Sequence, residues 1–243
     1  MLSVKPWRAE AIIRLILSLI MCFCAGSLVV AMMHHGAIDR PLSVGQMMVA
    51  ALSFQGAVLV LATRFIREHG TNWREGFGLS HQWPRAVLFG FICASLFLPA
   101  AWMLQWLSAQ MMVHFPKLHL RPEEQQAVQT LQMAVTWQHR LVLGLITILL
   151  APAAEEVLFR GILYPWIKQA GFPRLALWGT AILFAAIHFN LVTFIPLAIL
   201  AVILALLYDR MDNLLASITA HALFNAVNFA MLYSFQDRLL QSP

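Results

Sequence analysis

Two adjacent acids and an arginine, Glu155, Glu156 and Arg160, interrupt a long apolar stretch of the chain. Apolar residues fill most positions of Leu141–Leu150 before them and of Gly161–Tyr164 after them. A charged side chain at the centre of a membrane helix costs about 2.5–3.5 kcal/mol on insertion scales. Three ionisable groups within six residues are therefore expected to face partners inside a helical bundle, where they indicate a functional site.

Two histidines and an asparagine lie in the apolar segments that follow. His188 lies in the next hairpin, and His221 and Asn225 lie in the last apolar segment. Since residues four apart share one face of a helix, His221 and Asn225 are expected to project together.

The depths of these residues along the helices are compatible with one shared site. Glu155 lies about as far before the turn at Gly171–Phe172 as His188 lies after it, so the two would be level in an antiparallel hairpin. His221 follows a second polar turn, centred near Met211, on the same side of the membrane. At about 1.5 Å per residue, all three positions fall roughly 15–25 Å from that side.

These side chains are of the kinds that hydrolyse a peptide bond. Such hydrolysis needs a base that takes a proton from water and donors that hold the developing oxyanion. No serine, cysteine or threonine occupies a comparable constellation, which argues against a covalent nucleophile. Each residue could instead have a purely structural role. Arg160 can simply neutralise Glu156, and a membrane histidine or asparagine, including Asn228, can link helices by hydrogen bonds. Because all these residues are expected at similar depths in the membrane, we favour a shared functional site.

Composition identifies an integral membrane protein. The 243-residue chain is 60% hydrophobic and 11% charged, against about 25% charged residues in soluble domains. The net charge is +5. The basic residues are scattered through the loops and do not cluster on one face, so no nucleic-acid partner is expected. Cys22, Cys24 and Cys93 lie in apolar segments and predict neither a disulfide framework nor a zinc knuckle.

We therefore predict an all-α fold, a polytopic transmembrane helical bundle of about seven spans, with a range of six to eight. The expected spans are 12–33, 45–64, 86–107, 141–168, 175–189, 191–208 and 214–233. A single integral membrane domain is expected, with N-terminal spans and loops in 1–140 and the catalytic core in 141–235. Lys and Arg are more numerous in the loops on the side of the N-terminus, which predicts a cytoplasmic N-terminus.

Three motifs carry a resemblance to a known family. Glu155-Glu156-x-x-x-Arg160, Phe184-x-x-x-His188 and His221-x-x-x-Asn225 occur in order and resemble the CPBP family of CAAX proteases and bacteriocin-processing enzymes, also called Abi. The resemblance covers roughly residues 141–230, with a weaker feature at Phe77-Gly78-Leu79.

The resemblance implies an intramembrane endopeptidase. Glu155 and His188 would activate water, His221 and Asn225 would stabilise the oxyanion, and Glu156 with Arg160 would support the site. The implied substrate is a membrane-associated peptide or the end of a lipid-anchored protein, reached laterally or from the cytoplasmic side. The implied location is the inner (cytoplasmic) membrane of a bacterium.

Alternatives stay open at this point. We predict no cofactor, but two histidines and a glutamate can also form a zinc site with an open position. A proton-coupled transporter could use the same residues as a relay, although such carriers favour inverted repeats and broken helices that the sequence does not display. A non-catalytic membrane regulator that binds a sensor kinase or an immunity target is the third reading.

Overall fold

The computed structural model describes residues 2–33, 42–80, 82–114, 129–130, 132 and 136–241. In these ranges every regular element is a helix, which confirms the all-α prediction. Within the described residues, six helical segments are long and apolar enough to cross a membrane: Ala9–Met33, Val44–Glu68, Trp83–His114, Trp137–Gln169, Leu191–Met211 and Leu214–Ser234. Most of the segment between the predicted spans 86–107 and 141–168 lies outside the described residues, and the domain division at residue 140 stays a prediction.

The first half of the chain supplies three spans. The first is α1 (Ala9–Met33), and the second consists of α2 (Val44–Ala51), the π-helical turn η1 (Leu52–Gly56) and α3 (Ala57–Glu68). A short helix, α4 (Trp73–Gly76), precedes the third span, α5 (Trp83–His114).

The second half carries the acids. Its first span joins α7 (Trp137–Leu145), η3 (Ile146–Leu150), α8 (Ala151–Glu156), η4 (Val157–Leu163) and α9 (Tyr164–Gln169), where η again marks π-helical turns. It is followed by α10 (Pro173–Ala186), α11 (Leu191–Met211) and α12 (Leu214–Gln241).

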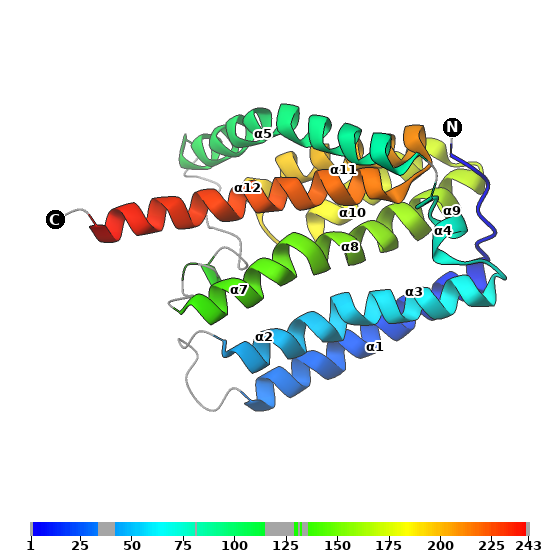
Figure 1. The fold of residues 1–243 in the computed structure, drawn as a ribbon, viewed down its shortest axis with the longest axis horizontal. Helices are drawn as coiled ribbons and strands as arrows, with labels where there is room; N and C mark the ends of the chain where they lie inside the picture. Colours follow the sequence, from blue (N-terminus) through cyan, green and yellow to red (C-terminus); the bar gives the residue numbers. More distant parts are fainter. Residues whose placement is uncertain are drawn as a thin grey trace.

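The long helices run side by side along the long axis, with the N-terminus at one end and the C-terminus at the other (Figure 1). The pair formed by α1 and α2–α3 lies at one edge and α5 at the opposite edge, with α8, α10, α11 and α12 between them. Helix α5 packs on α11 and α12. Along the second span, α2 contacts α7, η1 contacts α8, and α3 contacts η4. Since the contacts follow the same order in both spans, the second and fourth spans run parallel to each other, with η1 beside α8.

The predicted fifth span, 175–189, is shorter than expected. Helix α10 has 14 residues and ends at Ala186, about 21 Å at 1.5 Å per residue, which is less than the roughly 30 Å of a hydrocarbon core. The chain then turns through Phe189, with φ 49°, and the side chain of Asn190 accepts from Thr193 N to start α11. Irregular backbone at such a depth is tolerated where it lies against protein or lines a cavity.

The segment before α1 holds the fourth span in place. The buried indole of Trp7 donates from Nε1 to the carbonyl of Gly161, 2.9 Å away. Gly161 lies in the π-helical turn η4, which interrupts the regular α-helical hydrogen bonds of this span. A Cβ at Gly161 would lie 2.7 Å from Phe77 Cε1, so only glycine admits the Phe77 ring at this position. The N-terminal segment and the loop after α3 thus meet at η4, directly after the acids.

The same loop supports the turn between α11 and α12. Leu214 N donates to the carbonyl of Phe77 at 3.0 Å. Gly78 has φ 68°, and a Cβ there would lie 1.8 Å from Asp212 O. The Phe77-Gly78 pair therefore touches two spans that carry site residues, which gives this sequence feature a physical reason.

We expect Trp7→Phe to lower the stability of the protein by about 1–3 kcal/mol, because the ring remains while the buried Gly161 carbonyl loses its donor. The measurement is the midpoint of thermal unfolding in detergent. Trp178→Phe is the matched control, since Trp178 is 56% exposed on α10. Equal midpoints for the two variants would contradict this role of Trp7.

Candidate active site

A buried chain of three polar side chains joins the fourth span to α12. Arg160 Nη1 donates to Glu156 Oε1 at 2.7 Å, and the same oxygen lies 2.9 Å from His221 Nδ1. The three residues are 1%, 0% and 3% exposed, respectively. Glu156 ends α8, and Arg160 lies one helical turn later in η4. The negative charge of Glu156 is therefore paired with the positive charge of Arg160 inside the protein.

Glu155 approaches the opposite side of the same imidazole. Its Oε2 lies 3.8 Å from His221 Nε2, and its side chain is 13% exposed, against 0% for Glu156. His221 thus lies between the two glutamates, with one ring nitrogen directed at each. Glu156 fixes the orientation of the ring, and Glu155 is the acid that a small molecule can reach.

Phe184 is the aromatic centre of the cluster. It is fully buried, and the Arg160 guanidinium carbon lies 4.6 Å from its ring centroid, in cation–π range. Its ring also contacts His188 and His221, with centroid separations of 4.9 and 5.6 Å. The phenylalanine of the Phe184-x-x-x-His188 motif is therefore the surface on which the cation and both imidazoles pack.

His188 lies in the turn after α10 and is partly exposed. Its Nδ1 is 2.8 Å from the carbonyl of Phe184. Since a carbonyl only accepts, Nδ1 carries the hydrogen, which leaves Nε2 of the neutral ring as an acceptor. Within the described part of the chain no hydrogen bond joins His188 to either glutamate. The structure brings His188 to the cluster through Phe184 and not by direct contact with Glu155.

Asn225 has a partner that sequence reasoning did not identify. Its Nδ2 donates to the carbonyl of Thr147 in η3 at 2.9 Å. That carbonyl lacks a backbone donor because Ala151 N–H is directed at Ile146 O and Pro152 has no N–H. One N–H of the carboxamide is thus occupied, and the second is free to bind another group. Asn228, by contrast, accepts from Trp102 Nε1 on α5 and acts as a link between helices.

Some polar atoms of the cluster have no partner. Glu156 Oε2 and Arg160 Nε are buried without a hydrogen bond in the described ranges, although Arg160 Nη2 donates to Ala201 O at 3.1 Å. Unsatisfied buried groups are rare in native proteins and call for an explanation such as a catalytic role or a bound water.

Comparison with known proteins gives a match over the part of the chain that carries the candidate site residues. Residues 137–227 match the family model described as type II CAAX prenyl endopeptidase Rce1-like. This part of the chain is therefore similar to the Rce1-like peptidases and is called the Rce1-like domain below. The match confirms the resemblance stated from the three motifs.

A protein similar to part of this chain occurs in Bacillus subtilis strain 168. The uncharacterized protein YpbD is 36% identical over 92 residues, which cover 36% of this chain and 44% of YpbD. The chain therefore aligns with less than half the length of that relative. No solved structure matches the chain.

The positions of the possible metal ligands can be compared with the zinc site considered above. Among the described residues, no group of three or more His, Cys, Asp or Glu side chains is placed to share one metal ion. Glu156 Oε1 is already engaged by both Arg160 and His221. These positions do not fit a three-ligand zinc site, and we derive no step through a metal.

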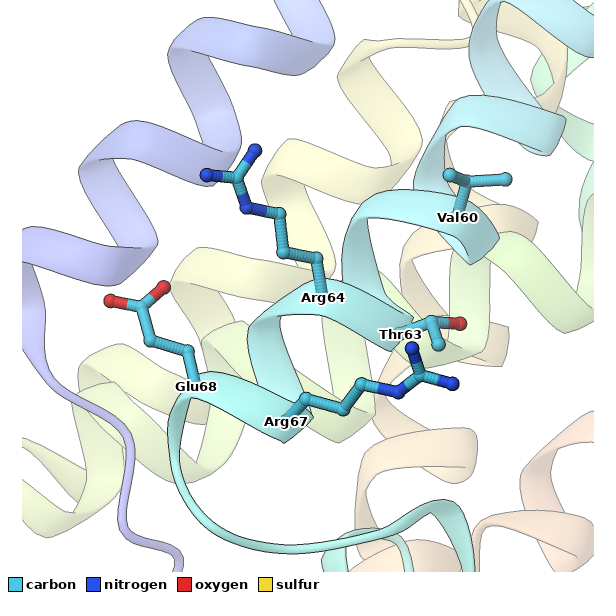
Figure 2. Close-up of a pocket in the computed structure, with 5 residues that line it drawn as sticks. All are labelled: Val60, Thr63, Arg64, Arg67 and Glu68. Atoms are coloured by element: carbon cyan, nitrogen blue, oxygen red, sulfur yellow. The ribbon is translucent and has the colours of Figure 1, made fainter.

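An open hollow of about 720 Å³ lies away from these residues, on α3. Figure 2 shows its lining by Val60, Thr63, Arg64, Arg67 and Glu68, with the two arginines pointing apart. Glu68 pairs with Arg8 and Arg14 of the N-terminal region. None of the six predicted site residues lies here, and exposed arginines at the end of a span are typical of a membrane boundary.

We expect Arg160→Met to destabilise the Rce1-like domain by about 3–5 kcal/mol, because it leaves the buried Glu156 carboxylate without its cation. In the double variant Glu156→Gln/Arg160→Met, most of that loss should be recovered, since the uncompensated charge is gone. Thermal unfolding of both variants measures the coupling. A double variant no more stable than Arg160→Met would contradict the ion pair as the source of the loss.

We expect Asn225→Ala to lower stability by about 1–3 kcal/mol, because the Thr147 carbonyl loses the donor that Asn225 Nδ2 supplies. In a Pro152→Ala background, a backbone N–H becomes available to the fourth span, so the same substitution should cost less. The double-mutant cycle is read from thermal unfolding midpoints. Identical costs in the two backgrounds would contradict the pairing of Asn225 with the carbonyl freed by Pro152.

Proposed function

We propose that the protein is an intramembrane endopeptidase in which Glu155 and His188 activate a water molecule and His221 and Asn225 stabilise the oxyanion. The observation that carries the proposal is the position of His221, held on one nitrogen by Glu156 and facing Glu155 with the other. The match to the model of a peptidase family supports the reaction class.

Glu155 is the proposed general base. It is the more accessible of the two acids, and Arg160 is hydrogen bonded to the other one. In the proposed step, a Glu155 oxygen takes a proton from water while the water oxygen attacks the scissile carbonyl. The acceptor Nε2 of His188 helps to orient that water, and the proton then passes from Glu155 to the leaving amine.

His221 and Asn225 are the proposed donors to the oxyanion. With His221 protonated, the two carboxylates are balanced by two cations, an arrangement that limits the uncompensated charge in the interior. Nε2–H of His221 and the second N–H of Asn225 then lie on one face of α12. Donors preorganised in a site that excludes water stabilise the negative charge that develops on the carbonyl oxygen.

Glu156 and Arg160 are positioning residues in this proposal. A carboxylate that binds Nδ1 of a histidine holds the imidazole in one tautomer and orientation, as in hydrolase triads. Arg160 in turn fixes the carboxylate and keeps its charge balanced.

The proposed substrate is a membrane-associated peptide or the end of a lipid-anchored protein. Support comes from the position of the acids within a candidate span and from the description of the family as CAAX prenyl endopeptidases. We place the protein in the cytoplasmic membrane of a bacterium with its N-terminus in the cytoplasm.

The experiment is cleavage of quenched membrane peptides by purified protein in detergent. We expect the wild type to cleave and Glu155→Ala, His188→Ala and His221→Ala to lose at least about 100-fold in rate, in line with the loss of a general base or an oxyanion donor. His114→Ala is the control, because His114 is exposed at the end of α5 and its Nδ1 lies 3.0 Å from the carbonyl of Gln110 in its own helix.

Two further outcomes separate the alternatives. Activity that survives chelation supports the metal-free mechanism, whereas loss on chelation that zinc restores would replace it with the zinc-dependent one. Absence of cleavage by the folded wild type across a peptide library would contradict the peptidase proposal in favour of the transporter or regulator.

A further inference from the structure

Gln55 is a polar side chain in the middle of the second span, outside the three motifs. It lies in η1, between the apolar helices α2 and α3. Its Oε1 is buried and has no hydrogen-bond donor among the described residues. An unsatisfied buried acceptor destabilises a fold by about 1–3 kcal/mol, so a glutamine here calls for an explanation beyond packing.

The backbone around Gln55 is also unusual. The π-helical turn at Leu52–Gly56 interrupts an otherwise α-helical span. Single π-helical turns of this kind occur frequently at functional sites, where they redirect a side chain.

The direction of Gln55 follows from its neighbours. A Cβ at Gly26 of α1 would lie 2.1 Å from Ser53 Cβ, and Phe54 contacts Phe23 of α1 with ring centroids 6.0 Å apart. Ser53 and Phe54 therefore face α1. Because residues two apart lie on roughly opposite sides of a helix, Gln55 faces away from α1.

The element on that side is α8, which ends in Glu155 and Glu156. Helix α8 packs against η1, in addition to α1 and the neighbouring parts of the same span. Figure 1 shows the pair formed by α1 and α2–α3 at the edge of the bundle next to α8. Gln55 thus lies on the side of the second span that packs on α8, the helix that carries the proposed base.

We propose that Gln55 binds the peptide backbone of the substrate across from Glu155, an inference that rests on the proposed function. A carboxamide offers one acceptor and two donors, so it pairs with the N–H and the C=O of an extended peptide. The substrate then provides the donor that Gln55 Oε1 lacks. Because the contact is to backbone, it is independent of the peptide sequence.

The test uses the full chain with Gln55→Leu, which keeps the size and removes both hydrogen-bonding atoms. We expect kcat/KM to fall about tenfold, the loss that one to two peptide hydrogen bonds produce. The fall should be similar for two unrelated peptide sequences. We also expect the thermal midpoint to stay the same or to rise, because the unsatisfied acceptor is removed.

Gln46→Leu is the matched control on the same span. Gln46 is buried, but its Oε1 accepts from Ser43 N at 2.7 Å in a capping box at the start of α2. This variant should lose thermal stability and keep kcat/KM in its folded fraction. The two glutamines are thus expected to respond in opposite ways.

The outcomes separate this inference from the proposed function. If the wild type cleaves and Gln55→Leu cleaves equally well, Gln55 does not bind substrate. A Gln55→Leu protein that loses stability together with activity would make Gln55 a structural residue and also overturn the inference. A folded wild type that cleaves no peptide would instead remove the proposed function itself.

Discussion

The site depends on one buried interaction, the hydrogen-bonded chain from Arg160 through Glu156 to His221. In an apolar bundle, none of the three side chains is tolerated alone, because an unpaired charge there is strongly unfavourable. Together they balance charge, fix an imidazole and leave its second nitrogen facing Glu155. The division of the two glutamates into a buried partner and a more accessible acid follows from this chain.

The fourth span can carry these residues because other parts of the protein complete its backbone hydrogen bonds. Pro152 and Pro165 remove two N–H groups from the helix, before and after the acids. The Thr147 carbonyl before the acids accepts a hydrogen bond from Asn225 of α12, and the Gly161 carbonyl after them accepts one from Trp7 of the N-terminal segment. Helix irregularity in a membrane protein is tolerated when neighbours supply such bonds. The N-terminal half therefore positions the site even though its motif signal is weak.

Sequence reasoning succeeded where the signal is local. Apolar runs mark the spans, and the spacing of Glu156 and Arg160 places an ion pair on one helix face, which the structure contains. The motif order led to the family. The fifth span was predicted too long, because apolar composition continues through Ile187 and Phe189 while the helix ends at Ala186.

Contacts between distant segments could not be predicted in the same way. The bond from Glu156 to His221 depends on the rotation of α12, and the partner of Asn225 depends on a carbonyl that the π-helical turn at η3 leaves free. Trp7 lies 154 residues from Gly161 and has no pattern that marks it. The sequence does mark Gln55, as a carboxamide within an apolar run. The side of the span on which Gln55 lies follows only from the packing of η1 against α1 and α8.

The central claim is that this site directs water at a peptide bond without a metal and without transfer of an enzyme carboxylate oxygen to the substrate. Single-turnover cleavage in H₂¹⁸O by chelator-treated protein tests it most directly, with the new carboxyl terminus of the product analysed by mass spectrometry. The account predicts one ¹⁸O atom in that carboxyl group. Unlabelled product would contradict it, because the oxygen would then come from an enzyme carboxylate, and so would the absence of product after chelation.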